Sequence, residues 1–132
     1  MKNPWKELIS KAKTAARPGQ EKKNGIKRTE PLEVTIDEFY LIKQFSKQSG
    51  KCYWTDFPIN PQGVFESNNP LSPSLERLDE TKGYIPGNVV IALRLFNLGR
   101  QRCPETKFKE QVQFLKDHFS GKDMRNSLEK ML

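Results

Sequence analysis

The sequence is poor in the side chains that most often bind transition metals. Its 132 residues include one histidine, His118, and two cysteines, Cys52 and Cys103, which do not form a Cys-x-x-Cys pair. A structural zinc site needs about four such ligands, so no structural zinc is expected. The sequence also has no apolar N-terminal leader and no apolar run long enough to cross a bilayer. We therefore expect reduced thiols, no membrane contact and a cytoplasmic location.

Negative charge is also in short supply. There are 16 Asp and Glu residues against 23 Lys and Arg, which gives a formal net charge of +7. A surface of this sign attracts polyanions, and nucleic acid is the leading class of partner. A small basic protein with no nucleic-acid role fits the same composition. The length suits one domain with a modest core, so a single domain over residues 1–132 is expected.

The N-terminal region is expected to be a basic helix followed by a basic arm. Apolar residues recur at helical spacing from Trp5 to Ala16, and Pro18 and Gly19 mark the end of this helix. Residues 18–31 contain Pro, Gly, Asn and several basic residues but few apolar ones, which predicts an arm without regular structure. Residues 1–33 together form this basic region.

A second helix is predicted by VTIDEFYLIKQFSKQSG, residues 34–50. Thr35 and Glu38 have the spacing of a capping box, and Val34 and Phe39 have the spacing of a hydrophobic staple. Gly50 marks the end of the helix. The buried face is expected to consist of Leu41, Ile42 and Phe45.

The following segments predict a hairpin that leads directly into a helix. Residues 51–59 indicate a short strand or turn, and residues 58–73, with four prolines, indicate a loop. SLERL and NVVIAL are the predicted hairpin arms, joined by residues 79–87.

Helical spacing resumes from about residue 91 to 102. Pro104 then opens a last helix, which Gly121 ends, and residues 122–132 are expected to add a short helical turn. The apolar stripe of this last helix consists of Phe108, Val112, Leu115 and Phe119. The predicted fold class is therefore α+β and mostly helical, with residues 34–103 as the core region and residues 104–132 as a C-terminal helix and tail.

A hairpin followed by a helix can hold a divalent cation between its parts. Glu76 on the first arm and Asn97 on the helix both offer hard oxygen donors, which suit Mg²⁺ or Mn²⁺ better than zinc. A metal-dependent nuclease needs such a cation against the scissile phosphate and the leaving oxygen. The two residues therefore suit the geometry of such a metal site.

The stretch PSLERLDETKGYIPGNVVIALRLFN resembles the core of the HNH endonucleases, the ββα-metal superfamily, and especially its small phage and restriction-type members. The upstream SGKCYWTDFPI resembles the segment before that core, and the match covers about residues 34–100. The resemblance implies a ββα-metal hairpin-helix core flanked by α-helices, in a bacterium or a phage-infected cell. It also implies Glu76 and Asn97 as the metal ligands and Asn88 as the residue that ties the hairpin together. Without zinc, packing around Tyr53, Trp54 and Phe57 is expected to hold this core.

Arg77 stands where most of the superfamily has a general-base histidine. Arginine stays protonated and cannot take the proton of a water, so Arg77 is interpreted as a clamp on the scissile phosphate or a stabiliser of transition-state charge. Three groups remain as activators of the water: a metal-bound water, Asp79, and Tyr84 of the Gly-Tyr pair. Each of the two side chains also has a structural interpretation, Asp79 as a turn residue and Tyr84 as a packing residue.

The sequence predicts a divalent-metal-dependent DNA endonuclease, with a catalytically inactive HNH-like DNA-binding or inhibitory module as the alternative. Double-stranded DNA is the expected partner; RNA fits the charge equally well, but the resemblance points to DNA. A monomer that nicks one strand and a homodimer that cuts both strands remain open. The basic residues expected to contact DNA are Arg17, Lys22, Lys23, Lys27, Arg28, Lys82, Arg94, Arg100 and Arg102.

Overall fold

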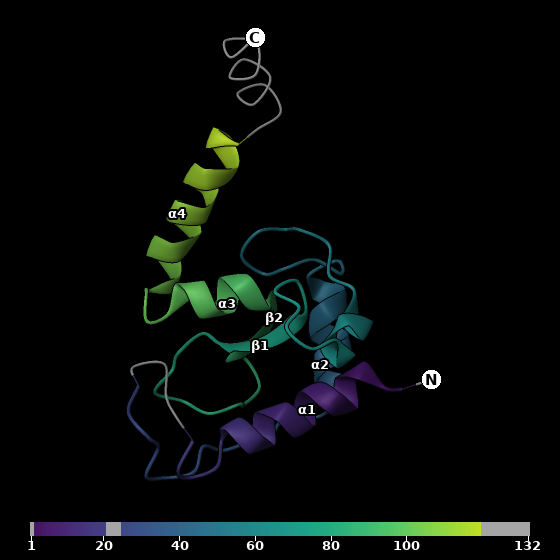
Figure 1. Ribbon diagram of the computed structural model, residues 1–132, viewed down its shortest axis with the longest axis vertical. Coiled ribbons are helices and arrows are strands. Elements are labelled where there is room, and N and C mark those ends of the chain that lie inside the picture. The colour runs from purple at the N-terminus through teal and green to yellow at the C-terminus, as the bar shows by residue number, and fades with distance from the viewer. Residues whose placement is uncertain (1, 21–24, 120–132) are drawn as a thin grey trace. The chain divides into compact units, whose positions relative to one another are not determined.

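The computed structural model describes residues 2–20 and 25–119. The chain separates into two compact units, Met1–Arg102 and Cys103–Leu132, and this boundary falls close to the predicted start of the C-terminal region. Within the described residues the fold is α+β, with four α-helices and one two-stranded antiparallel sheet (Figure 1). The predicted α+β class is confirmed at this level.

The first helix, α1 (Pro4–Ala15), forms where the apolar spacing predicts it. The Asn3 side chain caps its start by accepting two backbone N–H hydrogen bonds from the first turn, at 3.0 and 3.2 Å. Beyond its end the chain turns back, and Leu32 donates its N–H to the carbonyl of Ala16 at 2.9 Å. The basic arm is therefore fixed to the C-terminal end of α1 at this point.

The second helix, α2 (Glu38–Lys47), begins later than predicted. Its N-cap is Asp37, whose carboxylate accepts the N–H of Tyr40 at 2.8 Å. The predicted capping box is therefore wrong, because Thr35 lies outside the helix. The backbone N–H of Thr35 donates instead to the carbonyl of Tyr84 at 3.0 Å, so this segment pairs with the hairpin loop before the helix can start.

The exposed and buried faces of α2 also differ from the prediction. Phe39 is 82% exposed, so the predicted staple between Val34 and Phe39 is wrong. Leu41 is fully buried as expected, whereas Ile42 is exposed. The apolar residues of α2 are spread around the helix, and only the face that carries Leu41 meets the core.

Residues 51–59 form a turn, not a strand, and their only bridge is an isolated one between Lys51 and Pro58. A short 3₁₀ helix, η1 (Pro61–Phe65), then interrupts the predicted loop. The aromatic residues expected to hold the core differ in burial: Trp54 is buried, Tyr53 is half-buried and Phe57 is exposed. Packing in this region therefore depends on Trp54 more than on Tyr53 and Phe57.

The predicted hairpin is confirmed. Strands β1 (Pro73–Arg77) and β2 (Val89–Leu93) pair antiparallel, with Glu76 opposite Val90. Helix α3 (Arg94–Arg100) follows β2 without a loop. It is shorter than the predicted span of 91–102, because residues 91–93 still belong to the strand.

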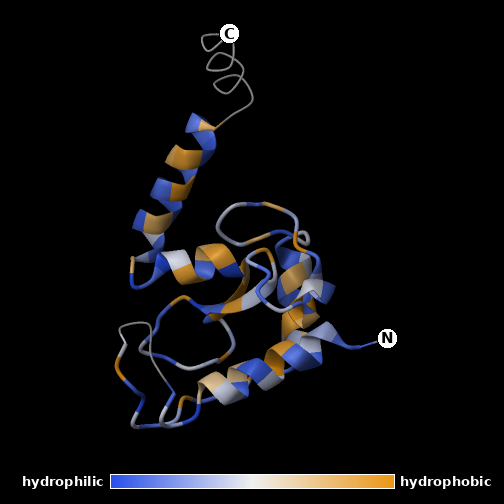
Figure 2. Cartoon of the chain, viewed as in Figure 1, coloured by the Kyte–Doolittle hydropathy of each residue, from blue (hydrophilic) through white to orange (hydrophobic). Residues whose placement is uncertain are grey.

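The core of the first unit lies between α1, α2 and the hairpin. Figure 1 shows the hairpin with α1 on one side and α3 on the other. Figure 2 shows apolar residues recurring along α1 and along β2, as expected for elements that bury one face or, for β2, the whole strand. The buried cluster consists of Leu8, Ala12, Ala16, Ile36, Leu41, Val64, Tyr84 and Val89.

The second unit contains α4 (Glu105–His118), which starts directly after Pro104 as predicted. An ion pair between Glu105 and Lys109, at 3.2 Å, spans its first turn. The predicted end at Gly121 and the turn over 122–132 lie outside the described residues. Among the helices in residues 2–20 and 25–119, none is both long and apolar enough to cross a bilayer.

Candidate functional site

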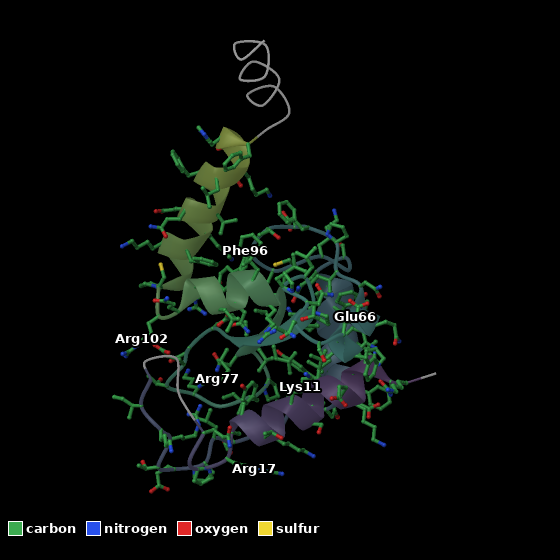
Figure 3. The ribbon with its side chains drawn as sticks, viewed as in Figure 1. Lys11, Arg17, Glu66, Arg77, Phe96 and Arg102 are labelled. Atoms are coloured by element: carbon green, nitrogen blue, oxygen red, sulfur yellow. The ribbon has the colours of Figure 1, made fainter. Side chains whose placement is uncertain are left out.

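Strand β1 sends its successive side chains to opposite faces of the hairpin. Glu76 faces α3, where it contacts Arg100. Arg77 leaves the other face, and its guanidinium carbon lies 5.5 Å from the centre of the Tyr84 ring. Figure 3 shows Arg77 on the α1 side of the hairpin. The predicted metal ligand and the residue in the histidine position therefore face different regions of the protein.

Glu76 and Arg100 form a buried ion pair. The Arg100 Nη1 lies 3.0 Å from Glu76 Oε1, and the two side chains are 7% and 1% exposed. Arg100 also donates to the carbonyls of Arg77 and Leu78, at 3.1 and 2.9 Å, and its guanidinium carbon lies 5.0 Å from the Trp54 ring centre. The sequence predicted Arg100 as a DNA contact, but its guanidinium is turned into the protein and holds α3 against β1.

Asn97 lies one helical turn before Arg100 and also contacts β1. Its amide nitrogen donates to the Ser74 hydroxyl at 2.5 Å and to the Leu75 carbonyl at 3.1 Å. Ser74 and Glu76 share one face of β1 because they are two residues apart. The structure therefore brings the two predicted metal ligands to the same side of the strand. The amide nitrogen of Asn97 faces the strand, so its amide oxygen is directed away from these two acceptors.

The donor atoms fit magnesium or manganese in type. A carboxylate and an amide oxygen are hard ligands, and Mg²⁺ commonly takes few protein ligands while keeping waters and substrate phosphates. The described residues contain no cluster of three or more His, Cys, Asp or Glu side chains that could hold a metal without such help. Arg100 would compete with a cation for Glu76, because its guanidinium already balances the charge of that carboxylate.

Arg77 is held by the loop that joins the strands. Its Nη1 donates to the carbonyls of Glu80 and Lys82, at 2.7 and 2.8 Å. Beneath it, the Tyr84 ring belongs to the buried core cluster, and Tyr84 pairs through its backbone with Glu33 and Thr35. These contacts fit the packing interpretation of Tyr84, and they leave its proposed chemical role as a prediction.

Asp79 forms a side-chain turn at the start of the loop. Its Oδ1 accepts the backbone N–H of Thr81 at 2.9 Å and the Thr81 hydroxyl at 2.6 Å. These two hydrogen bonds, helped by the charges of Lys82 and Arg77, lower the pKa of Asp79 below its usual value. A lowered pKa makes the carboxylate a weaker base, so the geometry favours the turn interpretation of Asp79 over water activation.

Asn88 ties the hairpin loop together, as the resemblance implies. Its Oδ1 accepts the N–H of Asp79 at 2.8 Å, and its Nδ2 donates to the carbonyls of Asp79 and Gly83, at 3.0 and 2.9 Å. Gly83 is also required in this loop, for a reason that the sequence did not indicate. A Cβ at this position would lie 2.4 Å from the carbonyl oxygen of Glu33, so only glycine lets the arm pass this close.

A cleft of about 500 Å³ adjoins the site on the α1 side. It lies between α1, the loop after η1, and the hairpin, and both Asn97 and Tyr84 line it. The sequence did not single out three of its polar residues, Ser67, Asn68 and Ser74, because distant segments bring them together. The lining also includes Lys11 and Arg94, and Arg94 is one of the predicted DNA contacts.

The residues predicted to contact DNA fall into three groups. Five are exposed: Arg17, Lys27, Lys82, Arg94 and Arg102. Arg28 and Arg100 are buried instead. Lys22 and Lys23 lie outside the described residues. Of the exposed group, Arg102 pairs with Glu80 at 2.9 Å, which reduces its availability to a phosphate.

Comparison with protein-family models finds none that matches this chain, and comparisons with curated proteins and with solved structures give no match either. The geometry of the hairpin and α3 is therefore the basis for proposing a function.

Proposed function

We propose that this protein is a divalent-metal-dependent DNA endonuclease of the HNH type, with the hairpin and α3 as its ββα-metal core. One observation carries the proposal: Glu76 and Asn97 come from two different elements, yet both face the same side of β1. The net charge of +7 adds the attraction to a polyanionic substrate. Mg²⁺, or Mn²⁺ in its place, is the cofactor that these oxygen donors suit.

The residues of the chain have distinct parts in this proposal. Glu76 and Asn97 hold the cation, which when bound supplies Lewis-acid stabilisation of the charge on the phosphate. Asn88 keeps the loop closed and so fixes the end of β1. Arg77 carries positive charge on the opposite face, and Tyr84 stays a candidate for proton transfer beside it. Arg100 must give up part of its contact with Glu76, or share that carboxylate with the cation.

The Glu76–Arg100 pair also favours a second candidate function. A buried carboxylate that already has a cationic partner at 3.0 Å needs no metal to balance its charge. In that case Glu76 and Asn97 only lock α3 to the hairpin, and the basic surface binds DNA without cutting it. This candidate is a non-catalytic DNA-binding or inhibitory module.

Cleavage of a long supercoiled plasmid of varied sequence separates the two functions. Purified protein is incubated with Mg²⁺, Mn²⁺ or EDTA, and binding is followed in parallel by gel shift. We expect nicking or linearisation that needs the metal and is lost in Glu76→Gln, while the surface control Glu80→Gln keeps it. DNA binding without cleavage under every metal condition would instead establish the non-catalytic module.

The same assay tests which side chain activates the water. Tyr84→Phe removes one hydroxyl and keeps the buried ring, whereas Asp79→Asn keeps the oxygen that accepts from Thr81. We expect Asp79→Asn to retain most of the cleavage rate, because the Thr81 hydrogen bonds make Asp79 a weak base. A large loss in Tyr84→Phe with unchanged DNA binding would assign proton transfer to Tyr84. No loss in either variant would leave the metal-bound water as the activator.

A further inference from the structure

The cleft between α1, the loop after η1 and the hairpin has an apolar floor and a polar rim. The floor consists of members of the buried core cluster: Leu8, Ala12, Val64 and Tyr84. The rim consists of exposed polar residues, which include Lys11, Ser67, Asn68 and Arg94. A cleft of this composition suits a ligand that has an apolar body and polar or charged edges.

The charged groups of the lining favour an anion. Lys11 comes from α1 and Arg94 is the first residue of α3, so two exposed cations reach the cleft from different elements. Among the described residues of the lining, the one carboxylate is Glu66, which accepts a hydrogen bond from Asn69 at 2.7 Å. Lys11 and Glu66 are labelled in Figure 3. The lining therefore carries positive charge overall, which attracts an anionic group to the rim.

The volume of the cleft limits what can enter it. At about 500 Å³, it lies in the range of pockets that hold one small ligand. A DNA duplex, whose major groove alone is about 12 Å wide, is too broad for it. A single nucleotide matches both the size and the lining, because it has a base with apolar faces, hydrogen-bonding base edges and a phosphate.

The cleft opens beside the candidate metal site. Asn97 lines it, and so do Ser74 and Leu75, the two residues of β1 to which the Asn97 amide donates. A nucleotide in the cleft would therefore lie next to one of the two proposed metal ligands. To reach this position, a nucleotide of a duplex must first leave the base stack, which costs least for a mismatched or unpaired base.

We propose that the cleft binds one unpaired nucleotide of the DNA strand, directly beside the bond that is cut. The apolar floor receives the base, and Lys11 and Arg94 at the rim receive a phosphate of the same strand. The preferred substrate is then DNA with an unpaired or mismatched base next to the cut. The assignment to a DNA strand rests on the proposed function, whereas nucleotide binding in the cleft requires neither metal nor cleavage.

Binding of two labelled duplexes in EDTA tests the proposal without any metal. One duplex is fully paired, and the other has the same sequence with one additional unpaired nucleotide. We expect the wild type to prefer the second duplex by about tenfold or more. Ala15→Leu adds a larger side chain at a half-buried position of the lining and should remove most of this preference. Thr14→Leu is the control, since Thr14 is exposed on the same helix and is not among the described lining residues.

A second pair of variants covers the case in which Ala15→Leu fails to fold. Lys11→Ala changes an exposed residue, and it should weaken binding of the duplex with the unpaired nucleotide several-fold and reduce the slope of log K against log salt by about 1. Lys13→Ala removes the same charge from an exposed position of α1 that is not among the described lining residues, and it should have a smaller effect on both quantities.

A free nucleotide distinguishes the two sources of the ligand. Deoxyadenosine monophosphate, added at constant ionic strength, should displace the duplex with the unpaired nucleotide from the wild type but not from Ala15→Leu. If the free nucleotide binds the wild type without displacing that duplex, the cleft holds a free nucleotide and the assignment to a DNA strand is wrong.

The inference and the proposed function can fail separately. Equal binding of the two duplexes by the wild type, or equal effects of Lys11→Ala and Lys13→Ala, would overturn the inference and leave metal-dependent plasmid cleavage as it is. If neither duplex binds even at low salt, the proposed function fails and the inference with it. Loss of plasmid cleavage in Glu76→Gln with an unchanged preference for the unpaired nucleotide supports both.

Discussion

Glu76 and Arg77 are neighbours in the chain, but their side chains serve opposite faces of the same strand. Glu76 is buried against Arg100 of α3, and Arg77 is held over Tyr84 by two loop carbonyls. Arg77 is therefore no simple substitute for a base beside the acid. The structure instead places the Glu76 carboxylate and the Arg77 guanidinium on opposite faces of β1.

The Glu76–Arg100 pair is expected to contribute strongly to stability. Removing one partner, as in Glu76→Ala, leaves the other charge buried and should lower the free energy of unfolding by about 3–5 kcal/mol. The exposed pair of Glu80 and Arg102, at 2.9 Å, is the matched control, and Glu80→Ala should cost less than about 1 kcal/mol. Urea unfolding at neutral pH measures both. Equal effects for the two variants would show that burial of the first pair adds nothing.

Asn88→Asp tests the loop clamp with a minimal change. The variant keeps an oxygen for the N–H of Asp79 but loses the two hydrogen bonds that Nδ2 donates to Asp79 and Gly83. Unsatisfied carbonyls in a partly buried loop should cost about 1–3 kcal/mol. Thermal or urea unfolding gives the value, and hydrogen exchange of the Asp79 amide reports the loop directly. A variant as stable as the wild type would mean that the loop closes without Asn88.

Gly83→Ala should weaken the contact between the hairpin loop and the arm. The added Cβ would lie 2.4 Å from the oxygen and 2.8 Å from the nitrogen of Glu33. Overpacking of this kind typically costs about 1–3 kcal/mol. Gly99→Ala is the control, since a Cβ there meets nothing within 4 Å and should stabilise α3 by up to about 1 kcal/mol. The expectation fails if the two alanine variants shift the unfolding midpoint in the same direction.

The turn at Asp79 has a pH signature. Because Thr81 lowers the pKa of Asp79 in the folded state, this group favours folding above its ordinary pKa, and the contribution is lost as the pH falls through the lowered value. Thr81→Val removes the hydroxyl donor and should move the pKa of Asp79 back towards its ordinary value. A carboxyl-carbon NMR titration measures this, with the other carboxylates as internal reference. An unchanged Asp79 titration in the variant would contradict the hydrogen-bond assignment.

Local signals explain which elements could be predicted from sequence. The hairpin, α1 and the start of α4 each depend on spacing or on a residue such as Pro104, and all three form as expected. The start of α2 was predicted wrongly because two capping residues compete within three positions. Asp37 caps the helix and Thr35 does not, because the backbone N–H of Thr35 donates to the carbonyl of Tyr84 in the distant hairpin loop.

In the candidate site too, local spacing could be predicted from the sequence, whereas contacts between distant segments could not. The spacing of Glu76 and Asn97 predicted that two elements would place them together, and in the structure Asn97 donates to Ser74 and Leu75 of the strand that carries Glu76. The partner of Glu76 was not predictable, because nothing in the sequence of α3 distinguishes a buried Arg100 from a surface one. The position of Arg28 depends on how the arm returns to the hairpin, which no local pattern encodes.

The close passage of Glu33 over Gly83 sets an order of events in folding. Residues 32–36 hydrogen-bond to Ala16, which is earlier in the sequence, and to Tyr84, which is much later. The contact with Tyr84 can form only after the hairpin loop has formed. During synthesis the basic N-terminal region is made first, but it can complete its contacts only after that loop has been made. A long-range closure of this kind slows folding and makes it cooperative. Shortened versions that lack the N-terminal region should therefore still form the hairpin loop, but without the hydrogen bond that Tyr84 donates to Glu33.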